Sequence, residues 1–495
     1  MNDIIYLVAL PLAMAFFIPM IGRKVRWLPD VLANATTLVL LILAGQTVGR
    51  EGVYALGGWA APLGIVLVLD SLSSLLLLII NLVSFMATLF SVDYLEKLYT
   101  SKLRYYSLFL LMVAGMNGTV LTGDFFNLFV FLEIASIASY ALVGFGCEAD
   151  ELEASFKYLV IGSIASTFVL LAVALLYGRL ATLNMAHVAW LLQQNGFDRV
   201  TTFAFVLLLV GFLVKGALIP FHAWLPDAHP SAPAPISAML SGVLIKAIGI
   251  YVLIRLTYNV FGITPMLSAL FTSIGVISMM IGVLLALGQW DFKRLLAYHS
   301  ISQMGYVVLG IGLGTPLGLL GGLFHLLNHS LFKSLLFLDS GSVEYETGTR
   351  ELEKMGNLSQ KMPVTAGSTL VASLSISGIP PFNGFWSKLV IILAAVQAGR
   401  AGLAVWAVIG SILTLASFSK IQRYAFFGQG KDFEPGKWAL YQEVPLLMRI
   451  PLLVLSTLCL AGGLILWGGL NGFWGPVVEV LLGGPADYIG SILGR

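Results

Sequence analysis

The sequence predicts an all-α membrane protein that crosses the bilayer many times. Of its 495 residues, 58% are hydrophobic and only 11% are charged, whereas soluble domains carry about 25% charged residues. Apolar runs of about 20 residues, the length that spans a bilayer core, follow one another along the whole chain. This composition excludes a soluble enzyme, and a net charge of +2 provides no basic face for a nucleic acid.

The apolar runs number about fourteen when each is required to be long enough to span a bilayer. They cover residues 4–22, 28–48, 71–92, 105–122, 125–146, 154–178, 201–229, 234–257, 264–287, 296–313, 317–340, 363–398, 402–427 and 445–470. The longest polar stretches, 341–362 and 428–444, have the length of loops. We therefore expect no soluble domain.

Basic residues are distributed unevenly between the two sets of loops, and this asymmetry predicts the orientation. Seventeen belong to the odd-numbered loops, beginning with Arg23, Lys24 and Arg26, and five belong to the even-numbered loops, Arg255 among them. Because cytoplasmic loops carry the excess of Lys and Arg, we expect the odd-numbered loops in the cytoplasm and both termini outside. No basic region precedes the first apolar run, so a retained first span is expected.

The chain contains no motif for a cofactor or metal. Its two cysteines, Cys147 and Cys459, are too few for the four thiolates of a typical iron–sulfur cluster. Neither a GxGxxG loop nor a Walker-type phosphate loop occurs. We expect any redox chemistry or ATP hydrolysis to take place in another subunit, and whether the chain belongs to an enzyme stays open.

Five ionisable side chains in the apolar runs are singled out as intramembrane, where a charge costs at least about 2.5–3.5 kcal/mol and generally faces a polar interior. They are Glu133, Lys215, Lys246, Lys333 and Lys388. A lysine near the end of a span can instead snorkel, with its ammonium group at the interface. This alternative is open for Lys333 and Lys388, whereas Glu133 and Lys246 lie near span centres. For all five we favour a functional role.

The intramembrane charges do not balance. Four lysines face one clear carboxylate, Glu133, so at most one lysine can be paired with it. Because burial penalises the charged form of an amine, some of these lysines should be neutral part of the time. A lysine poised between two protonation states can carry a proton, and we interpret the set in this way.

The eleventh run, GGLFHLLNHSLFKSLLFLDSGS at 321–342, adds two histidines. His325, His329 and Lys333 are spaced i, i+4 and i+8, which places them on one helical face over about 12 Å. Two histidines without a further ligand make a poor metal site. Since histidine titrates near neutral pH, a hydrogen-bonded titratable row is the better interpretation.

Two apolar runs must be interrupted helices. Residues 363–398 would form a helix about 54 Å long, against a bilayer core of about 30 Å. Proline ends or kinks helices, and Pro220 and Pro380 lie in the similar sequences IPFHAW and IPPFNGFW. Each sequence has a lysine close by, Lys215 or Lys388. Corresponding interruptions in two halves of a chain indicate a transporter built from repeats.

Five motifs together resemble the antiporter-like subunits shared by Mrp-type cation/proton antiporters (their D-type subunit), membrane-bound hydrogenases and respiratory complex I. They are LTGDFFNLFVFLEI, LVKGALIPFHAWLPDAHPSAPAPISAMLSGVLIKAIGIY, DFKRLLAYHSISQMGY, HLLNHSLFKSLLFL and GIPPFNGFWSK. The resemblance implies fourteen helices with two inverted five-helix repeats, each containing one broken helix. The implied divisions are N-terminal helices in 1–104, a first repeat in 105–258, a second repeat in 259–427, and a last helix and tail in 428–495.

The resemblance also implies roles for the buried residues. Glu133 matches the glutamate of the family's fifth helix, and Lys215 matches its lysine partner on the broken seventh helix. Lys246 matches the connecting lysine of the eighth helix, and Lys388 the terminal lysine of the broken twelfth. The linking residues of the eleventh helix are matched by His325, His329 and Lys333.

A proton-translocating subunit of a multisubunit complex in a prokaryotic plasma membrane is therefore expected. Residues 57–72 resemble the D-type subunit of Mrp antiporters, whereas 224–240 and 325–343 are more similar to complex I and hydrogenase relatives. This mixture favours a membrane-bound hydrogenase or a related respiratory complex, with the D-type subunit of an Mrp antiporter or a complex I pumping subunit as alternatives. The implied partners are other antiporter-like and small membrane subunits and a peripheral redox module.

Other functions are less compatible with the buried residues. Sodium prefers several oxygen ligands, and buried lysines would repel it, so we expect any sodium path in another subunit. A membrane scaffold has no need of buried lysines. A polytopic membrane enzyme that handles lipid phosphates would need clusters of arginine and acidic residues at a membrane surface, and the sequence shows none. His222 and His229, in the first break, either contact the proton path or complete local hydrogen bonds. Asp70 and Asp124 are expected to be helix caps or interface residues.

Overall fold

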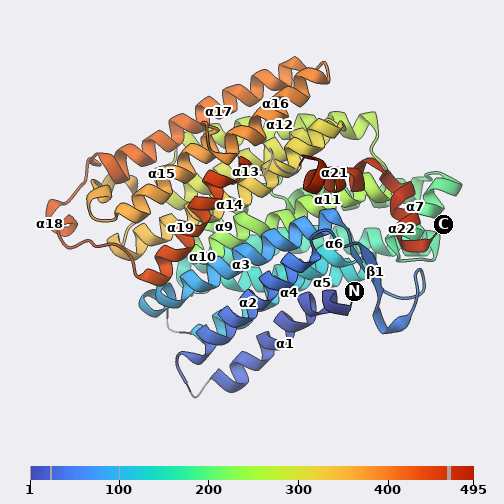
Figure 1. The fold of residues 1–495 in the computed structure, drawn as a ribbon, viewed down its shortest axis with the longest axis horizontal. Coiled ribbons are helices and arrows are strands. Elements are labelled where there is room, and N and C mark those ends of the chain that lie inside the picture. Colours follow the sequence, from blue (N-terminus) through green and yellow to red (C-terminus); the bar gives the residue numbers. More distant parts are fainter. Residues whose placement is uncertain (1, 23–24, 100, 465–469, 495) are drawn as a thin grey trace.

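The computed structural model describes residues 2–22, 25–99, 101–464 and 470–494. Its helices run side by side, most of them along the long axis of the molecule (Figure 1). This confirms the expected helical membrane architecture. Arg23 and Lys24, and residues 465–469 of the expected last span, lie outside the described residues.

The N-terminal part begins with a 3-10 helix at Asn2–Ile5. Four long helices follow: α1 (Tyr6–Ile21), α2 (Leu28–Thr47), α3 (Ser71–Leu98) and α4 (Lys102–Leu121). Between α2 and α3 lies an antiparallel hairpin of β1 (Gly52–Ala55) and β2 (Val66–Leu69), with a 3-10 turn at Leu56–Gly58. The apolar runs did not predict this short strand pair, which lies in a chain that is otherwise mostly helical. Gly57 and Gly58 adopt positive φ angles there, which other residues rarely adopt.

The next helices contain the first interruption. They are α5 (Phe125–Val143), α6 (Ala149–Leu180), α7 (Met185–Asn195), α8 (Arg199–Lys215), α9 (Leu225–Ser231) and α10 (Ala234–Met239). The chain continues through π-helical turns at Leu240–Leu244 and Lys246–Tyr251, α11 (Val252–Arg255) and a π-helical turn at Leu256–Val260. The short α7 between two long helices is a feature that the apolar runs did not predict.

The following helices contain the second interruption. They are α12 (Pro265–Leu287), α13 (Phe292–Gly312), α14 (Pro316–Thr347), α15 (Pro363–Ser377), α16 (Asn383–Gln397) and α17 (Ala401–Ile421), which continues as a π-helical turn at Gln422–Phe427. Two 3-10 turns, Leu352–Lys354 and Leu358–Gln360, connect α14 to α15. Thr264, Asp291 and Thr315 cap the starts of α12, α13 and α14 with side-chain oxygens.

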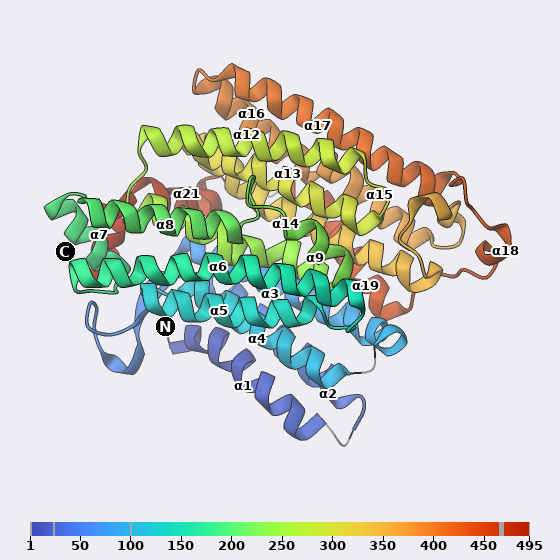
Figure 2. The same cartoon turned by 180° about the vertical axis from the view of Figure 1, so that it is seen from behind.

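The C-terminal part contains α18 (Pro435–Trp438), α19 (Leu446–Ala461), a π-helical turn at Leu470–Trp474, α21 (Gly475–Leu482) and α22 (Gly484–Leu493). Residues 475–493 were expected to be a tail. Instead, α21 packs on α3 and α14, and α22 packs on α7. The two chain ends lie toward the same end of the bundle, opposite α18 (Figures 1 and 2).

Both expected helix interruptions are confirmed. α8 ends at Lys215, and the next helix, α9, begins only at Leu225. α15 ends with Gly378 in the left-handed conformation (φ 78°), and α16 begins at Asn383. Glycine is the usual residue at such a helix C-terminus because it lacks a Cβ.

Eight helices in the described part of the chain are long and apolar enough to cross a membrane. They are 3–21, 28–47, 71–98, 125–143, 149–180, 234–260, 265–287 and 401–427. The total of fourteen and the two inverted repeats stay predictions, as does the side of the membrane on which the termini lie. The chain is a membrane-embedded, multi-pass protein.

Burial separates central from peripheral helices. The most apolar 18-residue stretch within 234–260 is entirely buried inside the molecule. In the corresponding stretch of α3, 72% of the residues are buried. Peripheral helices instead expose large apolar side chains, such as Ile137 on α5, Phe156 on α6 and Leu284 on α12. The ribbons of these three helices lie on the near side of the bundle in Figure 2. An apolar surface of this kind is compatible with contact with lipid. The polar residues described below lie instead in the centre of the bundle.

Gly249 allows a close approach between the end of α8 and the π-helical turn that follows Lys246. A Cβ atom at this position would lie 2.6 Å from Gly216 Cα and 2.9 Å from the Lys215 carbonyl carbon. Both neighbours are backbone atoms, which cannot move aside alone. Gly249 thus sets the separation between the helices that carry Lys215 and Lys246.

We expect Gly249→Ala to lower the free energy of unfolding by about 1–3 kcal/mol, the cost of overpacking a buried site. The matched control is Gly45→Ala on α2, where a Cβ would meet nothing within 4 Å. Thermal unfolding midpoints of the purified proteins in detergent measure the difference. Equal midpoints for the two variants would contradict the close approach.

Candidate functional site

Lys215 and Glu133 face each other at the first helix break. Lys215 is the last residue of α8 and is buried, and its Nζ lies 4.0 Å from Glu133 Oε1 on α5. The same Nζ donates to Ser136 Oγ at 2.9 Å and to Tyr140 Oη at 3.1 Å. Ser166 on α6 donates its hydroxyl to Glu133. The structure therefore brings the two predicted residues together, at the C-terminus of a helix, where a positive charge is favoured.

The Glu133 side chain is 26% exposed, in contrast to Lys215 at 2%. The pair therefore extends from the interior of the bundle toward its surface.

Lys246 lies in the second π-helical turn and is completely buried. Its Nζ donates to the carbonyl oxygens of Ser241 and Gly242, each at 2.6 Å. π-Helical turns interrupt the regular i→i−4 pattern and are frequent at functional sites. Here the irregular backbone provides oxygen acceptors for an amine that has no carboxylate partner among the described ion pairs.

The predicted row on α14 is confirmed as a buried face. His325 contacts Ser387 Oγ through Nδ1 at 2.9 Å and Gln303 Oε1 through Nε2 at 3.2 Å. Lys333 donates to the backbone carbonyl of Leu296 on α13. The two ring nitrogens of His329 are buried and have no hydrogen-bond partner in the described part of the chain.

His329 occupies the centre of the row. It lies within electrostatic reach of four titratable groups, which are Lys246, Lys333, His325 and His229. His325 in turn lies within reach of Lys246 and Lys388. The residues from Lys246 to Lys388, which come from three separate helices, therefore form one connected set.

Lys388 lies at the second break. Its Nζ donates to the Ile376 carbonyl at 2.7 Å and lies 4.6 Å from the centre of the Tyr306 ring. Ile376 is in the last turn of α15, where carbonyl groups lack helical partners. The snorkelling alternative is wrong for Lys388 and Lys333, because both are buried and bind carbonyls inside the bundle.

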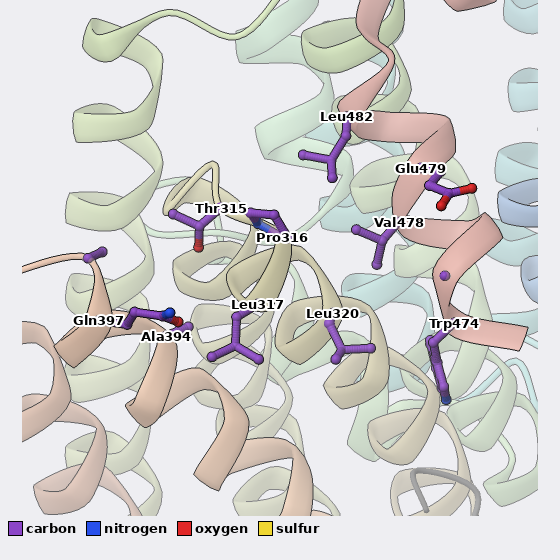
Figure 3. A pocket seen from close by; sticks show the side chains of 12 residues that line it. Thr315, Pro316, Leu317, Leu320, Ala394, Gln397, Trp474, Val478, Glu479 and Leu482 are labelled. Carbon is purple, nitrogen blue, oxygen red and sulfur yellow. The ribbon is translucent and has the colours of Figure 1, made fainter. Parts of the chain in front are cut away.

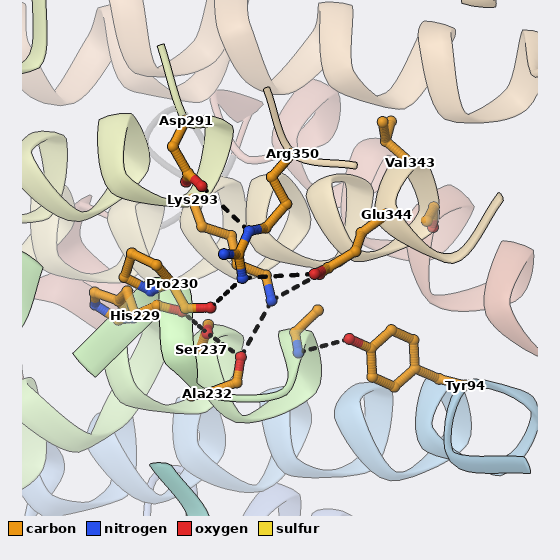
Figure 4. Close-up of polar contacts among 12 residues, drawn as sticks. Tyr94, His229, Pro230, Ala232, Ser237, Asp291, Lys293, Val343, Glu344 and Arg350 are labelled. Atoms are coloured by element: carbon orange, nitrogen blue, oxygen red, sulfur yellow. Dashed lines mark hydrogen bonds and ion pairs between the residues drawn. The ribbon is translucent and has the colours of Figure 1, made fainter. Parts of the chain in front are cut away.

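A second cluster of charges was missed because its members were assigned to loops. Lys293, the second residue of α13, is buried, with its Nζ 2.8 Å from Glu344 Oε2 on α14 (Figure 4). Arg350 pairs with Asp291 at 3.1 Å and with Glu344 at 3.5 Å. The sequence signal that could have revealed this cluster is the presence of acidic and basic residues near the ends of α13 and α14. This cluster surrounds the backbone carbonyls of Ala232 and Pro230, to which Lys293 and Arg350 donate.

His229, left open from the sequence, is also drawn in Figure 4. It is buried, and its ring stacks on Phe337 with a centroid distance of 4.5 Å. Lys333, Lys293 and Lys246 are all within its electrostatic reach. The structure therefore places it between the charge cluster and the α14 row. His222 is only partly buried.

Three other assignments change or are settled. Arg255 is not a loop residue; it is buried on α11 and pairs with Asp70 at 2.7 Å. Asp70 and Asp124 are confirmed as helix caps, of α3 and α5. The expectation of one intramembrane carboxylate is wrong, because Asp339 is fully buried on α14. His299, buried on α13 and 2.9 Å from Ser417 Oγ, was not predicted either.

A large cavity lies apart from these residues. Its volume is about 680 Å³, and it is bounded by the start of α14, the end of α16 and α21 (Figure 3). Its lining is mostly apolar, including Leu317, Leu320, Trp474 and Val478. None of the predicted site residues lines it.

A bundle of apolar helices with two interrupted helices and a buried row of lysines and histidines is the architecture of an antiporter-like membrane subunit. Residues 122–414, more than half of the chain, match the transmembrane family described as NADH:quinone oxidoreductase/Mrp antiporter. The chain belongs to this family.

Relatives come from two kinds of complex. The D-type subunit of the Na(+)/H(+) antiporter of Alkalihalophilus pseudofirmus is 39% identical over 386 residues, 77% of each chain. NADH-quinone oxidoreductase subunit N of Desulforudis audaxviator is 38% identical over 382 residues, 76% of each chain.

Solved structures show the same fold over nearly the full length. A chain of the Mrp complex from Dietzia sp. has a TM-score of 0.91 at 31% identity, with 99% of both chains covered. A chain of the membrane-bound sulfane sulfur reductase, an archaeal respiratory membrane complex, has a TM-score of 0.90 at 32% identity, covering 99% of this chain and 100% of that one. A chain of Thermus thermophilus respiratory complex I has a TM-score of 0.76 at 25% identity, covering 96% and 99%.

We expect Lys293→Met to lower the free energy of unfolding by about 1–3 kcal/mol, because it removes a charged partner from Glu344 at a buried position. The double variant Lys293→Met/Glu344→Gln should lose less free energy of unfolding than the two single variants lose in sum. The measurement is thermal unfolding in detergent. Lys437→Met is the control, since the Lys437–Glu434 pair is more than 60% exposed and should contribute less than about 1 kcal/mol. Strict additivity would contradict the pairing.

Proposed function

We propose that this chain moves protons across the membrane along its buried titratable residues. The observation that carries the proposal is the connected set around His329, in which two lysines and two other histidines lie within electrostatic reach of one unpartnered imidazole. Histidine accepts and releases protons near neutral pH, and burial penalises the charged form of an amine. A proton on one member of the set therefore disfavours a proton on the next.

The proposed path begins at Glu133 and Lys215 and continues through Lys246. It then follows the face of α14 through Lys333, His329 and His325 and ends at Lys388. Gly249 supports the first proton transfer, from Lys215 to Lys246. It lets the backbone at Lys215 lie against the π-helical turn that begins at Lys246. The hydrogen bond between Ser387, next to Lys388, and His325 supports the last transfer, from His325 to Lys388.

Coupling would act on the Glu133–Lys215 pair. At 4.0 Å its two charged atoms are just within ion-pair distance, and Lys215 holds two hydroxyl oxygens closer. The partly exposed carboxylate suits control by a neighbouring subunit. Opening the pair would leave Lys215 without its counter-charge and favour release of its proton toward Lys246.

The assembly that we propose is a multisubunit complex in a prokaryotic plasma membrane. Partner subunits would be other antiporter-like and small membrane proteins, with a peripheral redox module in a hydrogenase-like or respiratory complex. The high similarity to a chain of the archaeal sulfane sulfur reductase supports this placement. We further propose that the two broken helices belong to two inverted repeats, 105–258 and 259–427, and that both termini face outward.

We expect Lys215→Ala to reduce proton transport to the background level, because the proton would lose its acceptor between Glu133 and Lys246. The assembled complex is reconstituted in liposomes, and internal pH is followed with a fluorescent dye while electron transfer or ion exchange is driven. Lys437→Ala, an exposed lysine, is the matched control and should transport normally. Unchanged proton flux in Lys215→Ala would refute the proposal.

Sodium–proton exchange is a second candidate, favoured by the 39% identity to the D-type subunit of a Na(+)/H(+) antiporter. The described residues contain no group of three His, Cys, Asp or Glu side chains that could hold a metal ion. We therefore expect this chain, reconstituted alone, to take up no radioactive sodium, and any exchange to require other subunits. Saturable sodium uptake by the isolated chain would contradict this expectation.

A further inference from the structure

A second set of buried polar side chains lies between α14, α15 and α19. It centres on Asp339, which is completely buried and accepts a hydrogen bond from Ser368 Oγ at 2.5 Å through Oδ1. Asp339 Oδ2 has no hydrogen-bond partner in the described chain. Asp339 follows Lys333 by six residues, so at 3.6 residues per turn it lies on a different face of α14 from the titratable row.

Hydroxyl groups on one face of α15 lead from Asp339 to the molecular surface. Thr365, Ser368 and Ser375 are spaced i, i+3 and i+10 and are all buried. Thr365 Oγ1 donates to Glu443 Oε1 at 2.7 Å, and Glu443 Oε2 accepts the backbone N–H of Val364 at the same distance. Glu443 lies in the loop before α19 and is partly exposed. The polar face therefore begins at the surface.

At its inner end this polar set reaches the second helix break. Cys459 on α19 lies against Ser375 and Asn383 and within electrostatic reach of Asp339. Asn383, the first residue of α16, accepts a hydrogen bond from Asn328 Nδ2 through its backbone carbonyl at 3.0 Å. Its side-chain amide has no partner in the described structure. Lys388 lies on the same helix, five residues further along.

The charges around Asp339 indicate what it binds. The groups that face it are Ser368 and Thr369 from α15, Cys459 from α19 and the carboxylate of Glu443. Among the described residues, no lysine, arginine or histidine forms an ion pair with it. A buried carboxylate without a cationic partner is costly, and a bound proton removes that cost. Ser375 Oγ and the Asn383 side-chain amide are also buried without a hydrogen-bond partner in the described chain.

We propose that Asp339 is a proton-binding site on a second polar route, which connects the surface at Glu443 with the helix break beside Lys388. The route deepens the proposed function and rests on it. A proton that reaches Asp339 neutralises its carboxylate, and its release toward the break restores the negative charge and protonates the Lys388 amine. The basic loops predict that the end with Glu443 is cytoplasmic, so the route would supply Lys388 without passage through Lys215.

Infrared difference spectroscopy tests the site directly. We expect the assembled complex, purified through a tag on this chain, to show the C=O stretching band of a protonated carboxylic acid that shifts in D₂O and disappears as pH rises. Asp339→Asn should lose this band. Ser342→Ala, a buried α14 variant whose hydroxyl bonds only its own helix, should keep it. A spectrum identical in wild type and Asp339→Asn would overturn the proposal.

Ser368→Ala keeps the test valid if Asp339→Asn fails to assemble. Loss of its hydrogen bond should move the C=O band to higher frequency without removing it, and an unmoved band would contradict the assignment. A change in carboxylate bands that depends on sodium rather than on pH would also overturn the proposal, in favour of a cation site. Neither result depends on transport.

Transport measurements separate this inference from the proposed function. We expect Asp339→Asn and Glu443→Gln to lower proton transport at least about threefold, and Asp339→Glu, which keeps a carboxyl group, to retain most of it. If Lys215→Ala abolishes transport but Asp339→Asn leaves transport and band unchanged, the second route alone is refuted. If Lys215→Ala transports normally while the Asp339 band is present, the proposed function fails and the proton site remains.

Discussion

The structure depends on one constraint, which is that an ionisable group at bilayer depth must find its polar partners inside the protein. Lysines meet this constraint by binding backbone carbonyls where helices are irregular. Lys246 binds two carbonyls in a π-helical region, and Lys388 binds the Ile376 carbonyl at the open end of α15. Irregular backbone therefore provides the acceptors for these two buried amines, whereas Lys215 binds the hydroxyls of Ser136 and Tyr140.

The same constraint separates two uses of charge in this protein. Where both partners are available, as in Arg255–Asp70 and Lys293–Glu344, the pair is close and links neighbouring helices. We interpret these two pairs as contacts that stabilise the packing of the helices. Where partners are missing, as for His329, a proton can be gained or lost without breaking an ion pair. Apart from the Glu133–Lys215 pair, the residues to which we assign transport have no ion-pair partner among the described residues and are buried.

The antiporter family to which this chain belongs has members in two kinds of complex, Mrp complexes and respiratory complexes. Its fold superimposes on subunits of an Mrp complex and of an archaeal respiratory complex almost equally well. The route that we propose uses only side chains of this chain, so it is compatible with either kind of complex. Within that route Glu133 is partly exposed, in contrast to the buried Lys215.

Much of this protein was predictable from the sequence. Apolar length, proline positions and the i, i+4, i+8 spacing on α14 are local properties, so the helical membrane architecture, the two breaks and the burial of His325, His329 and Lys333 were predicted correctly. The β1–β2 hairpin, the helices after residue 474, the burial of Lys293 and Arg255, and Asp339 were not. In each of these cases the outcome depends on what a distant segment provides. Arg255 is buried because Asp70 pairs with it, and Asp339 lies inside because the hydroxyls of α15 and the thiol of α19 surround it. The sequence by itself determined which groups are costly to bury; only the tertiary structure decided which partners meet them, because partners are brought together by packing between helices.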